Sequence, residues 1–287
     1  MKIAVVLLII ASSLLVQGCA NSLFYYPSKA TELNPNIRWM HSTSGNEIAY
    51  LWLPSVRKSS KGLVIHFHGN NGHMETTREK VDWLAEHGYH VLVFDYSGFG
   101  HSSGEPNDRS IYRDAISILE YTAQLHSITG LPVFIVATST GGNIFLRAWA
   151  DHPVTIEGMI IDSSFTSYVE EAEFMLKKGP WGKVYSWLAH LLMRDDYAAK
   201  SVMNRLANTK ALVIHCVSDR VVPIESGEGI YTQLDGDKRF WRIEGCSHAR
   251  AMTREFPETQ LRVLNWLEEA TPATEVARSQ TDFWLFD

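Results

Sequence analysis

Three polar side chains that are far apart in the sequence have the types needed for covalent nucleophilic catalysis. Ser139 lies within a run of small residues, Asp219 follows a hydrophobic stretch, and His248 precedes the last amphipathic segment. A serine hydroxyl becomes a strong nucleophile when a histidine accepts its proton and a carboxylate orients that histidine. Serine, acid and base also follow one another in an order known for such triads. The sequence therefore predicts Ser139, Asp219 and His248 as the catalytic residues.

The run around Ser139 has the composition of a sharp strand-to-helix turn. Residues 133–136 are apolar and strand-forming, and Ala137, Gly141 and Gly142 flank the serine. Such a turn holds its central side chain above the carboxyl edge of a sheet, and it needs small neighbours because the flanking backbones nearly touch. The alternative is an ordinary turn in which the serine caps the next helix. We favour the first interpretation, because the candidate acid and base also follow predicted strands.

The assignment of the acid has an alternative. Asp162 also ends a predicted strand, and some enzymes with this residue order take their acid from that strand. We prefer Asp219, because the Val-Val-Pro sequence at residues 221–223 lets the chain turn sharply into a helix that begins near Glu225.

Acyl transfer would also need hydrogen-bond donors for the charge that develops on the carbonyl oxygen of the substrate. The segment 68–72, His-Gly-Asn-Asn-Gly, follows a predicted strand and leads into a predicted helix. We predict that the backbone N–H groups of Asn70 and Thr140 form this oxyanion hole, with Asn71 a less favoured alternative to Asn70. By itself the segment is only a glycine-rich turn, but together with a nucleophilic serine turn it specifically indicates an oxyanion hole.

Histidine is frequent, with 12 residues, and His66, His68 and His73 could suggest a metal site. No acidic residue completes a ligand set there, and a buried or hydrogen-bonded histidine is the more common case. We therefore favour a site without metal, and a metallohydrolase is the weaker alternative.

Length and composition fit one globular domain. The chain has 287 residues, of which 45% are hydrophobic and 20% charged, and its formal net charge is −6. An α/β domain of this size can bury a large core as a single unit. No run of Lys and Arg stands out, so the sequence lacks the basic patch typical of nucleic-acid-binding proteins, and we expect no nucleic-acid partner.

The N-terminus has the pattern of a bacterial lipoprotein signal. Residues 3–16 are apolar, but the stretch is too short to favour a membrane-spanning helix. The Gly-Cys sequence that follows predicts cleavage of residues 1–18 and attachment of lipid, palmitate included, to Cys19. Ala20 favours sorting to the outer membrane of a Gram-negative cell envelope, and residues 19–36 would tether the domain. An uncleaved anchor and an ordinary signal peptide are the alternatives.

The two other cysteines could form a disulfide. Cys216 ends one predicted strand and Cys246 follows the next, and these strands would be neighbours. With Cys19 lipidated, an even number of cysteines remains in an oxidising compartment. Of the two interpretations, a disulfide or two separate buried thiols, we favour the separate thiols.

Strand-like and helix-like segments alternate after residue 60, which predicts a mostly parallel sheet covered by helices. One α/β domain is expected over residues 37–270, followed by a C-terminal tail over residues 271–287. Residues 37–41 and 47–53 are predicted to form an antiparallel pair. The other predicted strands are 63–68, 90–94, 133–136, 158–161, 211–217 and 239–243, and the clearest helices are 75–87, 110–125 and 258–269.

Residues 165–208 form a connection that is too long and too apolar for a solvated linker. The segment follows the sixth predicted strand. Two or three helices over the carboxyl edge of the sheet would explain it, and they would lie above Ser139 as a lid. A set of ordinary packing helices is the alternative.

Several segments together resemble the serine α/β-hydrolase superfamily. They are residues 24–28, 67–72, 95–106, 137–142, 219–223 and 245–248. The sequence Asp-Tyr-Ser-Gly-Phe-Gly-His-Ser from Asp95 is especially similar to the small-lid branch related to serine-aminopeptidase-like and prolyl-oligopeptidase-like hydrolases, which includes protein depalmitoylases. The resemblance covers roughly residues 24–270. It departs at Ala137 and at Cys216, each of which replaces a glycine.

The resemblance implies an α/β-hydrolase fold with helices on both faces of the sheet, a short helical lid after the sixth strand, and neither a metal nor an organic cofactor. It also implies that a carboxylic ester or thioester, such as a lipid acyl ester, is cleaved through an acyl-enzyme on Ser139. A serine peptidase or amidase of the same fold is the runner-up. A non-catalytic surface lipoprotein is the least favoured alternative, because all three triad residue types are present. The sequence does not identify the acyl group of the substrate.

Overall fold

The computed structural model describes residues 24–32, 34–179 and 182–271 of the chain. Within them, one eight-stranded sheet has the order β10-β9-β8-β7-β4-β6-β3-β2. Strands β4, β6, β7, β8, β9 and β10 pair in parallel, whereas β3 pairs antiparallel with both β2 and β6. The expected mostly parallel sheet and α/β-hydrolase architecture are confirmed. Residues 1–23, which include the signal segment and Cys19, and the tail from residue 272 lie outside the described residues.

The strands of this sheet fall close to the predicted segments. They are β2 (Ile37–His41), β3 (Glu47–Leu53), β4 (Gly62–Phe67), β6 (Tyr89–Phe94), β7 (Val133–Thr138), β8 (Gly158–Asp162), β9 (Lys210–Cys216) and β10 (Lys238–Ile243). Every residue of β4, β7 and β8 is buried. Strands covered on both faces read as continuous hydrophobic runs rather than as alternating patterns, which is why the sequence predicted them well.

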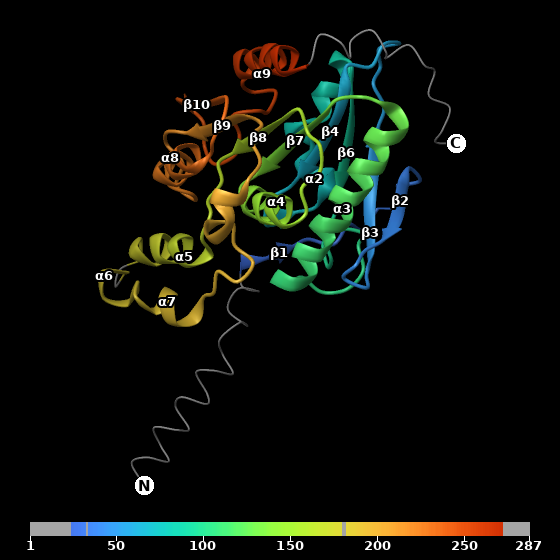
Figure 1. Cartoon of the computed structure of the whole chain (residues 1–287). Coiled ribbons are helices and arrows are strands. Elements are labelled where there is room, and N and C mark those ends of the chain that lie inside the picture. The colour runs from blue at the N-terminus through green and yellow to red at the C-terminus, as the bar shows by residue number, and fades with distance from the viewer. Residues whose placement is uncertain (1–23, 33, 180–181, 272–287) are drawn as a thin grey trace.

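Helices cover both faces of the sheet (Figure 1). The longer ones are α3 (Asp108–Thr129), α4 (Thr140–Asp151), α8 (Ile224–Gln233) and α9 (Pro257–Ala270). Buried side chains of α3, α4 and α8 share one core with the sheet. On the other face α9 shares a second core with the segment between β4 and β6. Among the described residues, no helix is long and apolar enough to span a membrane.

The helix predicted over residues 75–87 is wrong in detail. The segment holds one short α-helix, α2 (Met74–Thr77), followed by the 3₁₀ turns η2 (Arg78–Lys80) and η3 (Asp82–His87). The hydroxyls of Thr76 and Thr77 both donate to the carbonyl oxygen of His73, at 2.9 and 3.0 Å. Threonine hydroxyls that bond to nearby backbone groups weaken a helix interior. The segment therefore has the apolar spacing of a helix without forming one regular α-helix.

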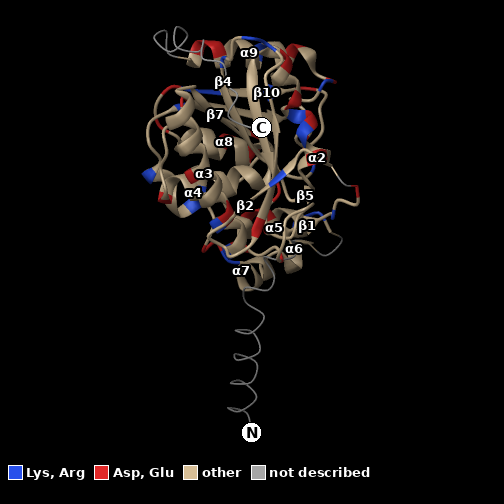
Figure 2. Ribbon diagram, turned by 90° about the vertical axis from the view of Figure 1, so that its right-hand side faces the viewer, with Lys and Arg blue, Asp and Glu red and all other residues tan. Residues whose placement is uncertain are grey.

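The long connection between β8 and β9, for which two or three helices were expected, contains three α-helices in its described residues. They are α5 (Tyr168–Lys177), α6 (Gly182–Tyr185) and α7 (Leu188–Leu192), and a 3₁₀ turn, η4 (Lys200–Arg205), follows them. In both ribbon views these helices gather at one end of the molecule, close to β1 (Tyr26–Pro27) (Figures 1 and 2). They lie outside the two layers that cover the sheet faces.

The described part of the expected tether packs against the domain. Strand β1 pairs in parallel with β5 (Asn71–Gly72) in a small second sheet. Tyr25 is buried, and its hydroxyl donates to Asp108 at 2.8 Å and lies 3.0 Å from the Tyr168 hydroxyl. This N-terminal segment therefore joins the candidate oxyanion loop to the first lid helix.

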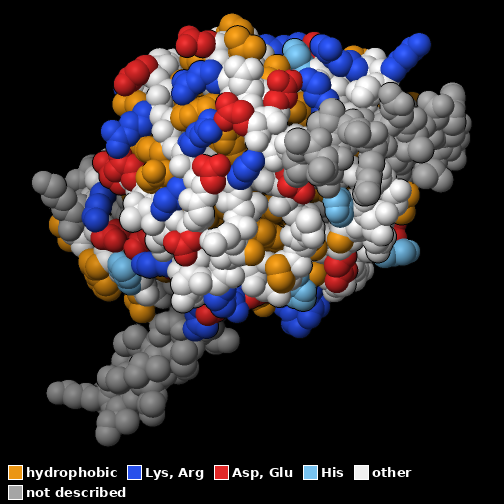
Figure 3. All heavy atoms as spheres, turned by 45° about the horizontal axis from the view of Figure 1, so that its top comes forward, with side chains coloured by type: hydrophobic (Ala, Val, Ile, Leu, Met, Phe, Trp, Pro, Cys, Tyr) orange, Lys and Arg blue, Asp and Glu red, His pale blue; other side chains and the backbone are white. Residues whose placement is uncertain are grey.

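Charged residues of both signs alternate around the molecule. Figure 2 shows lysine, arginine, aspartate and glutamate mixed along the outer elements. On the face drawn in Figure 3, acidic and basic side chains lie among hydrophobic ones without a continuous region of one sign.

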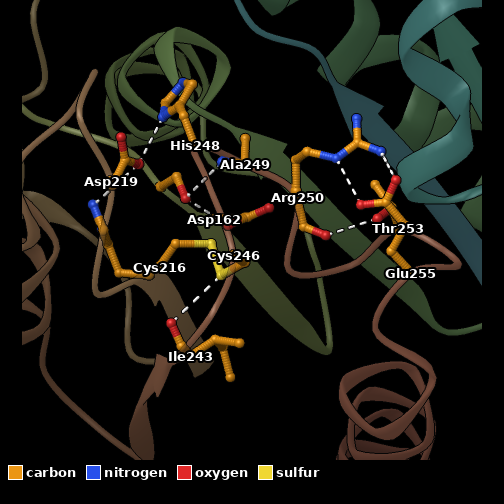
Figure 4. The surroundings of a disulfide bond; sticks show 12 residues. Asp162, Cys216, Asp219, Ile243, Cys246, His248, Ala249, Arg250, Thr253 and Glu255 are labelled. Atoms are coloured by element: carbon orange, nitrogen blue, oxygen red, sulfur yellow. Dashed lines mark hydrogen bonds and ion pairs between the residues drawn. A yellow bond between two sulfur atoms is a disulfide. The ribbon is translucent and has the colours of Figure 1, made fainter.

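Cys216 and Cys246 form a disulfide, so the expectation of two separate thiols was wrong. Cys216 is the last residue of β9, and Cys246 follows the neighbouring strand β10. Both cysteines are buried, with Cα atoms 5.4 Å apart. Asp219 and His248 lie close together on one side of this bond (Figure 4), so the disulfide ties together the loops that carry the candidate acid and base.

We expect the double variant Cys216→Ala, Cys246→Ala to lose stability, because the disulfide closes a loop with a sequence separation of 30. The loss in unfolding free energy should be about 3–4 kcal/mol, from the restricted unfolded chain. Urea unfolding of the oxidised wild type and the double variant measures it. Reduced wild type should behave like the variant, and free thiols at both positions in a non-reduced peptide map would contradict the bond.

Candidate active site

Ser139 occupies a sharp turn between β7 and α4. Its φ of 53° and ψ of −126° lie in a region that non-glycine residues rarely adopt. Its backbone N–H donates to the carbonyl oxygen of Asp162 at 2.8 Å, and its carbonyl oxygen accepts the Ser164 hydroxyl at 2.7 Å. The neighbouring strand β8 and the loop after it therefore hold the strained conformation.

The glycines after Ser139 are required by space. A Cβ on Gly141 would lie 2.2 Å from the carbonyl oxygen of Phe67, and one on Gly142 would lie 2.3 Å from the Ser164 hydroxyl oxygen. Ala137, in contrast, lies within β7, fully buried in the core. The strand accommodates its methyl group, so this departure from the usual glycine leaves the serine turn intact.

The structure brings the three predicted triad residues together. The Oγ of Ser139 lies 2.9 Å from Nε2 of His248. On the other side of the ring, Nδ1 of His248 lies 2.7 Å from Oδ2 of Asp219 (Figure 4). The Asp219 side chain is fully buried, and its other oxygen accepts the backbone N–H groups of Val221 and Val222 at 2.8 and 3.1 Å. These hydrogen bonds fix the position of the carboxylate, so that its Oδ2 can orient the imidazole.

Asp162, the alternative acid, has a different role. It is fully buried, and its Oδ1 accepts the hydroxyl of Ser163 at 2.9 Å. Burial raises the pKa of its carboxyl. The Ser163 hydroxyl oxygen accepts the backbone N–H of Ala249, the residue after His248, at 3.2 Å. Asp162 thus supports the loop that carries the histidine, while Asp219 contacts the imidazole itself.

Asn70 and Thr140 lie beside Ser139 in the wall of one cavity, as the predicted oxyanion hole requires. The Asn70 side chain donates to the carbonyl oxygen of Phe24 at 2.6 Å, and the Asn70 carbonyl oxygen accepts the backbone N–H of Tyr26 at 2.9 Å. The N-terminal segment therefore fixes the donor loop. Periodicity could not predict this support, because a strand of two residues is too short to show a pattern.

The cavity beside Ser139 has a volume of about 330 Å³ and a mainly apolar wall. Lid residues of α5 and α7 supply much of that wall, together with Phe24 and Phe165. The apolar residues are Phe24, Phe165, Ala172, Met175, Leu176, Ala189, Leu192, Met193, Val221 and Val222. The helices after β8 thus line a chamber next to the serine, and the shape and polarity suit a hydrocarbon chain.

Glu171 is an acidic residue in this mainly apolar wall. It is 4% exposed, and neither carboxyl oxygen has a hydrogen-bond partner among the described residues. Burial, together with the nearby Asp219 charge, raises the pKa of its carboxyl to about 8, and Lys178 opposes this shift. The group is therefore mostly protonated at neutral pH, which keeps the chamber free of charge.

Two of the three histidines that could have suggested a metal lie in the core, whereas His73 is partly exposed at the start of α2. His66 and His68 are both buried, His66 Nε2 lies 3.2 Å from the Thr138 hydroxyl oxygen, and His68 Nδ1 lies 2.7 Å from the Gly69 carbonyl oxygen. Burial lowers the pKa of His68 to about 4. In the described part of the chain, no group of three or more His, Cys, Asp or Glu side chains could hold a metal ion.

Comparison with known proteins identifies the family. Residues 58–204, more than half of the chain, match the family described as serine aminopeptidase, S33. The chain belongs to this family. It is a serine α/β-hydrolase, and the match includes Ser139 but ends before Asp219 and His248.

Relatives of this S33 family member differ in how far they align. The uncharacterized protein YfhR of Salmonella typhi is 26% identical over 94% of this chain and 95% of its own length. The lysophosphatidylserine lipase ABHD12 of Danio rerio is 29% identical over 63% of this chain, which spans about half (49%) of that relative.

Solved structures support the fold. A soluble variant of monoglyceride lipase from Saccharomyces cerevisiae superimposes with a TM-score of 0.67 at 18% identity, covering 87% of this chain and 99% of that one. An esterase from Exiguobacterium antarcticum gives a TM-score of 0.60 at 17% identity, covering 80% and 98%.

The buried Glu171 predicts a pH-dependent difference in stability between the wild type and Glu171→Gln. In the unfolded chain the carboxyl ionises near its ordinary pKa of 4.5, whereas in the folded protein it holds its proton up to about pH 8. The unfolding free energy of the wild type, compared with that of the variant, should be highest below the unfolded pKa. It should fall as pH rises through about 8, by an amount on the order of a few kcal/mol.

Urea unfolding of both proteins at pH 5 and pH 9 tests this expectation. Glu173→Gln is the matched control on the same helix, because the Glu173 carboxylate is paired with Lys177 at 2.8 Å and lies outside the apolar wall. It should show no alkaline loss of this kind. A wild-type stability that stays parallel to that of Glu171→Gln across this range would show that Glu171 ionises at its ordinary pKa.

Proposed function

We propose that the protein is an esterase that cleaves carboxylic esters or thioesters with an apolar acyl chain. The observation that carries the proposal is the chain of hydrogen bonds from Ser139 through His248 to Asp219, which opens onto an apolar chamber of about 330 Å³. A nucleophile, a base and an orienting acid within 2.7–2.9 Å of one another are the requirements of acyl transfer.

In the proposed reaction, His248 Nε2 accepts the hydroxyl proton of Ser139 as the Oγ attacks the carbonyl carbon. Asp219 stabilises the resulting imidazolium and fixes its orientation. The backbone N–H groups of Asn70 and Thr140 would donate to the oxyanion. The imidazolium then protonates the departing alcohol or thiol as the bond to the carbonyl carbon breaks. A water molecule, activated by the same histidine, hydrolyses the acyl-enzyme and releases the carboxylic acid.

A peptidase or amidase would use the same residues, and the family description favours this second candidate. The printed names of the lysophosphatidylserine lipase relative and of the esterase and monoglyceride lipase structures favour ester hydrolysis. The apolar chamber agrees with the ester, because an acyl chain gains about 0.8 kcal/mol for each CH₂ that it buries. Turnover of matched acyl esters and aminoacyl amides separates the two candidates.

We expect Ser139→Ala to lower kcat for a p-nitrophenyl acyl ester by at least ~10⁴-fold, because the nucleophile is removed. The same variant should no longer be labelled by a fluorophosphonate probe. Ser110→Ala is the control, since Ser110 is another buried serine but lies at the start of α3. Wild type that stays unlabelled, or a Ser139→Ala variant that keeps its activity, would refute the proposal.

We also propose that the mature protein is anchored to the bacterial cell envelope through lipid on Cys19, in the outer membrane where the cell is Gram-negative. The support is the apolar stretch that ends at Gly18-Cys19. Several acyl chains on one residue would hold the protein firmly, whereas a single chain binds reversibly.

Cys19→Ser should abolish incorporation of labelled palmitate and move the protein from the membrane fraction to the soluble fraction. The Cys216→Ala, Cys246→Ala double variant controls for labelling at the other cysteines, and it should keep the label. Palmitate incorporation into Cys19→Ser at the wild-type level would exclude this residue as the attachment site.

A further inference from the structure

Ser139 lies between two cavities of opposite character. Besides the apolar chamber, a second cavity of about 310 Å³ has Ser139 and Asn70 in its wall. Its other lining residues are mostly polar or glycine, and they include His66, Thr76, Thr77, Lys80, Thr138 and His248. An ester bound at Ser139 would therefore have a hydrocarbon environment on one side and a polar one on the other.

The position of His248 assigns the two sides. His248 lines the polar cavity and not the apolar chamber. The departing alcohol must take its proton from this histidine, so it has to leave on the side where the imidazole is exposed. The polar cavity is therefore the site of the alcohol portion, and the apolar chamber is the site of the acyl portion.

Lys80 supplies the positive charge of the polar cavity. Lys80 is only partly exposed, and its ammonium forms no hydrogen bond and no ion pair within the part of the chain that the structure describes. Two acids influence it from a distance, but Glu79 is paired with Arg250 at 3.4 Å, and Asp162 is absent from the cavity wall. A ligand that enters the cavity can thus pair with Lys80 without breaking a hydrogen bond or ion pair within the described part of the protein.

His66 adds a second polar group to the same wall. It is 1% exposed, and its Nδ1 has no hydrogen-bond partner among the described residues. Burial keeps the pKa of His66 well below its ordinary value, so the ring is neutral. The imidazole therefore contributes a polar but uncharged ring to the wall, and the positive charge of the cavity comes from Lys80.

We propose that the polar cavity binds an anionic group, specifically a phosphate ester, on the alcohol portion of the substrate, and that Lys80 determines this preference. The inference rests on the proposed esterase function and names its substrate class: acyl esters of phosphate-bearing alcohols. A lysine ammonium is a compact point charge that suits phosphate oxygens. A neutral alcohol would fill the cavity but leave the ammonium without a partner.

The test compares two substrates of equal acyl chain length, a 1-acylglycerol and the corresponding 1-acylglycerol 3-phosphate. The wild type should have a kcat/KM at least ~10-fold higher for the phosphate-bearing ester. Lys80→Met, which removes the charge at similar length, should lower kcat/KM for that ester by ~10–100-fold and change the neutral ester by less than about 2-fold. Lys80→Arg should restore most of the preference.

Lys61→Met is the matched control, because Lys61 is an exposed lysine paired with Glu268 and outside the cavity wall. It should leave both substrates unchanged. Turnover of the neutral ester shows that each variant is folded. Glycerol 3-phosphate should inhibit the wild type more strongly than inorganic phosphate, and the difference should vanish in Lys80→Met.

Each other outcome decides against the inference. If Lys80→Met lowers both esters equally, or neither, Lys80 does not recognise the phosphate. If inorganic phosphate inhibits as well as glycerol 3-phosphate and the wild type shows no preference for the phosphate-bearing ester, the cavity binds free phosphate only. If the wild type hydrolyses neither glycerol ester but still turns over the p-nitrophenyl acyl ester, this inference fails and the proposed function stands. If it hydrolyses none of the three, both fail.

Discussion

The site depends on a backbone conformation that an L-residue adopts only under constraint. Ser139 turns the chain from β7 into α4 with a positive φ, and such residues store about 1–3 kcal/mol of strain. Two other non-glycine residues with positive φ in the described ranges, Ser163 and Ala249, follow β8 and His248. All three are joined through adjacent contacts: Ser139 bonds to the backbone of Asp162, and the Ser163 hydroxyl oxygen accepts the N–H of Ala249. Each strained turn is thus held by the next, and their common result is the placement of His248 above the serine.

The second constraint is the edge shared by parallel strands. Ser139, Asp219 and His248 come from loops after β7, β9 and β10, and parallel strands present their carboxyl ends at one edge of a sheet. The Cys216–Cys246 bond reinforces this arrangement just below the loops of the acid and the base. Rigid support matters because Asp219 can stabilise the imidazolium only while its oxygen stays within hydrogen-bond distance of Nδ1.

These constraints explain which features the sequence could predict. The central strands are continuous apolar runs, so their positions in the sequence could be predicted. Because the three site residues each follow such a strand, it could also be predicted that they meet at one edge of the sheet. The disulfide could not be decided, because adjacency of β9 and β10 permits pairing but the direction of each Cβ depends on loop geometry. Apolar spacing predicted a regular helix over residues 75–87. The spacing does not show that the hydroxyls of Thr76 and Thr77 bond to a nearby backbone carbonyl oxygen. The burial of Glu171 and the position of Lys80 beside Ser139 are set by tertiary packing, which no periodic pattern records.

The electrostatics on the two sides of Ser139 are linked through Asp219. Its buried negative charge stabilises the imidazolium of His248 and also contributes, after burial, to the raised pKa of Glu171 in the acyl chamber. The same charge that supports proton transfer therefore helps to keep the chamber wall neutral, as a hydrocarbon chain requires. On the opposite side, the ammonium of Lys80 lies in a polar wall where a charge can be compensated by the ligand. A substrate with an apolar acyl chain and an anionic alcohol would be oriented by both environments at once, because reversal would place its charge in the chamber and its hydrocarbon against the ammonium.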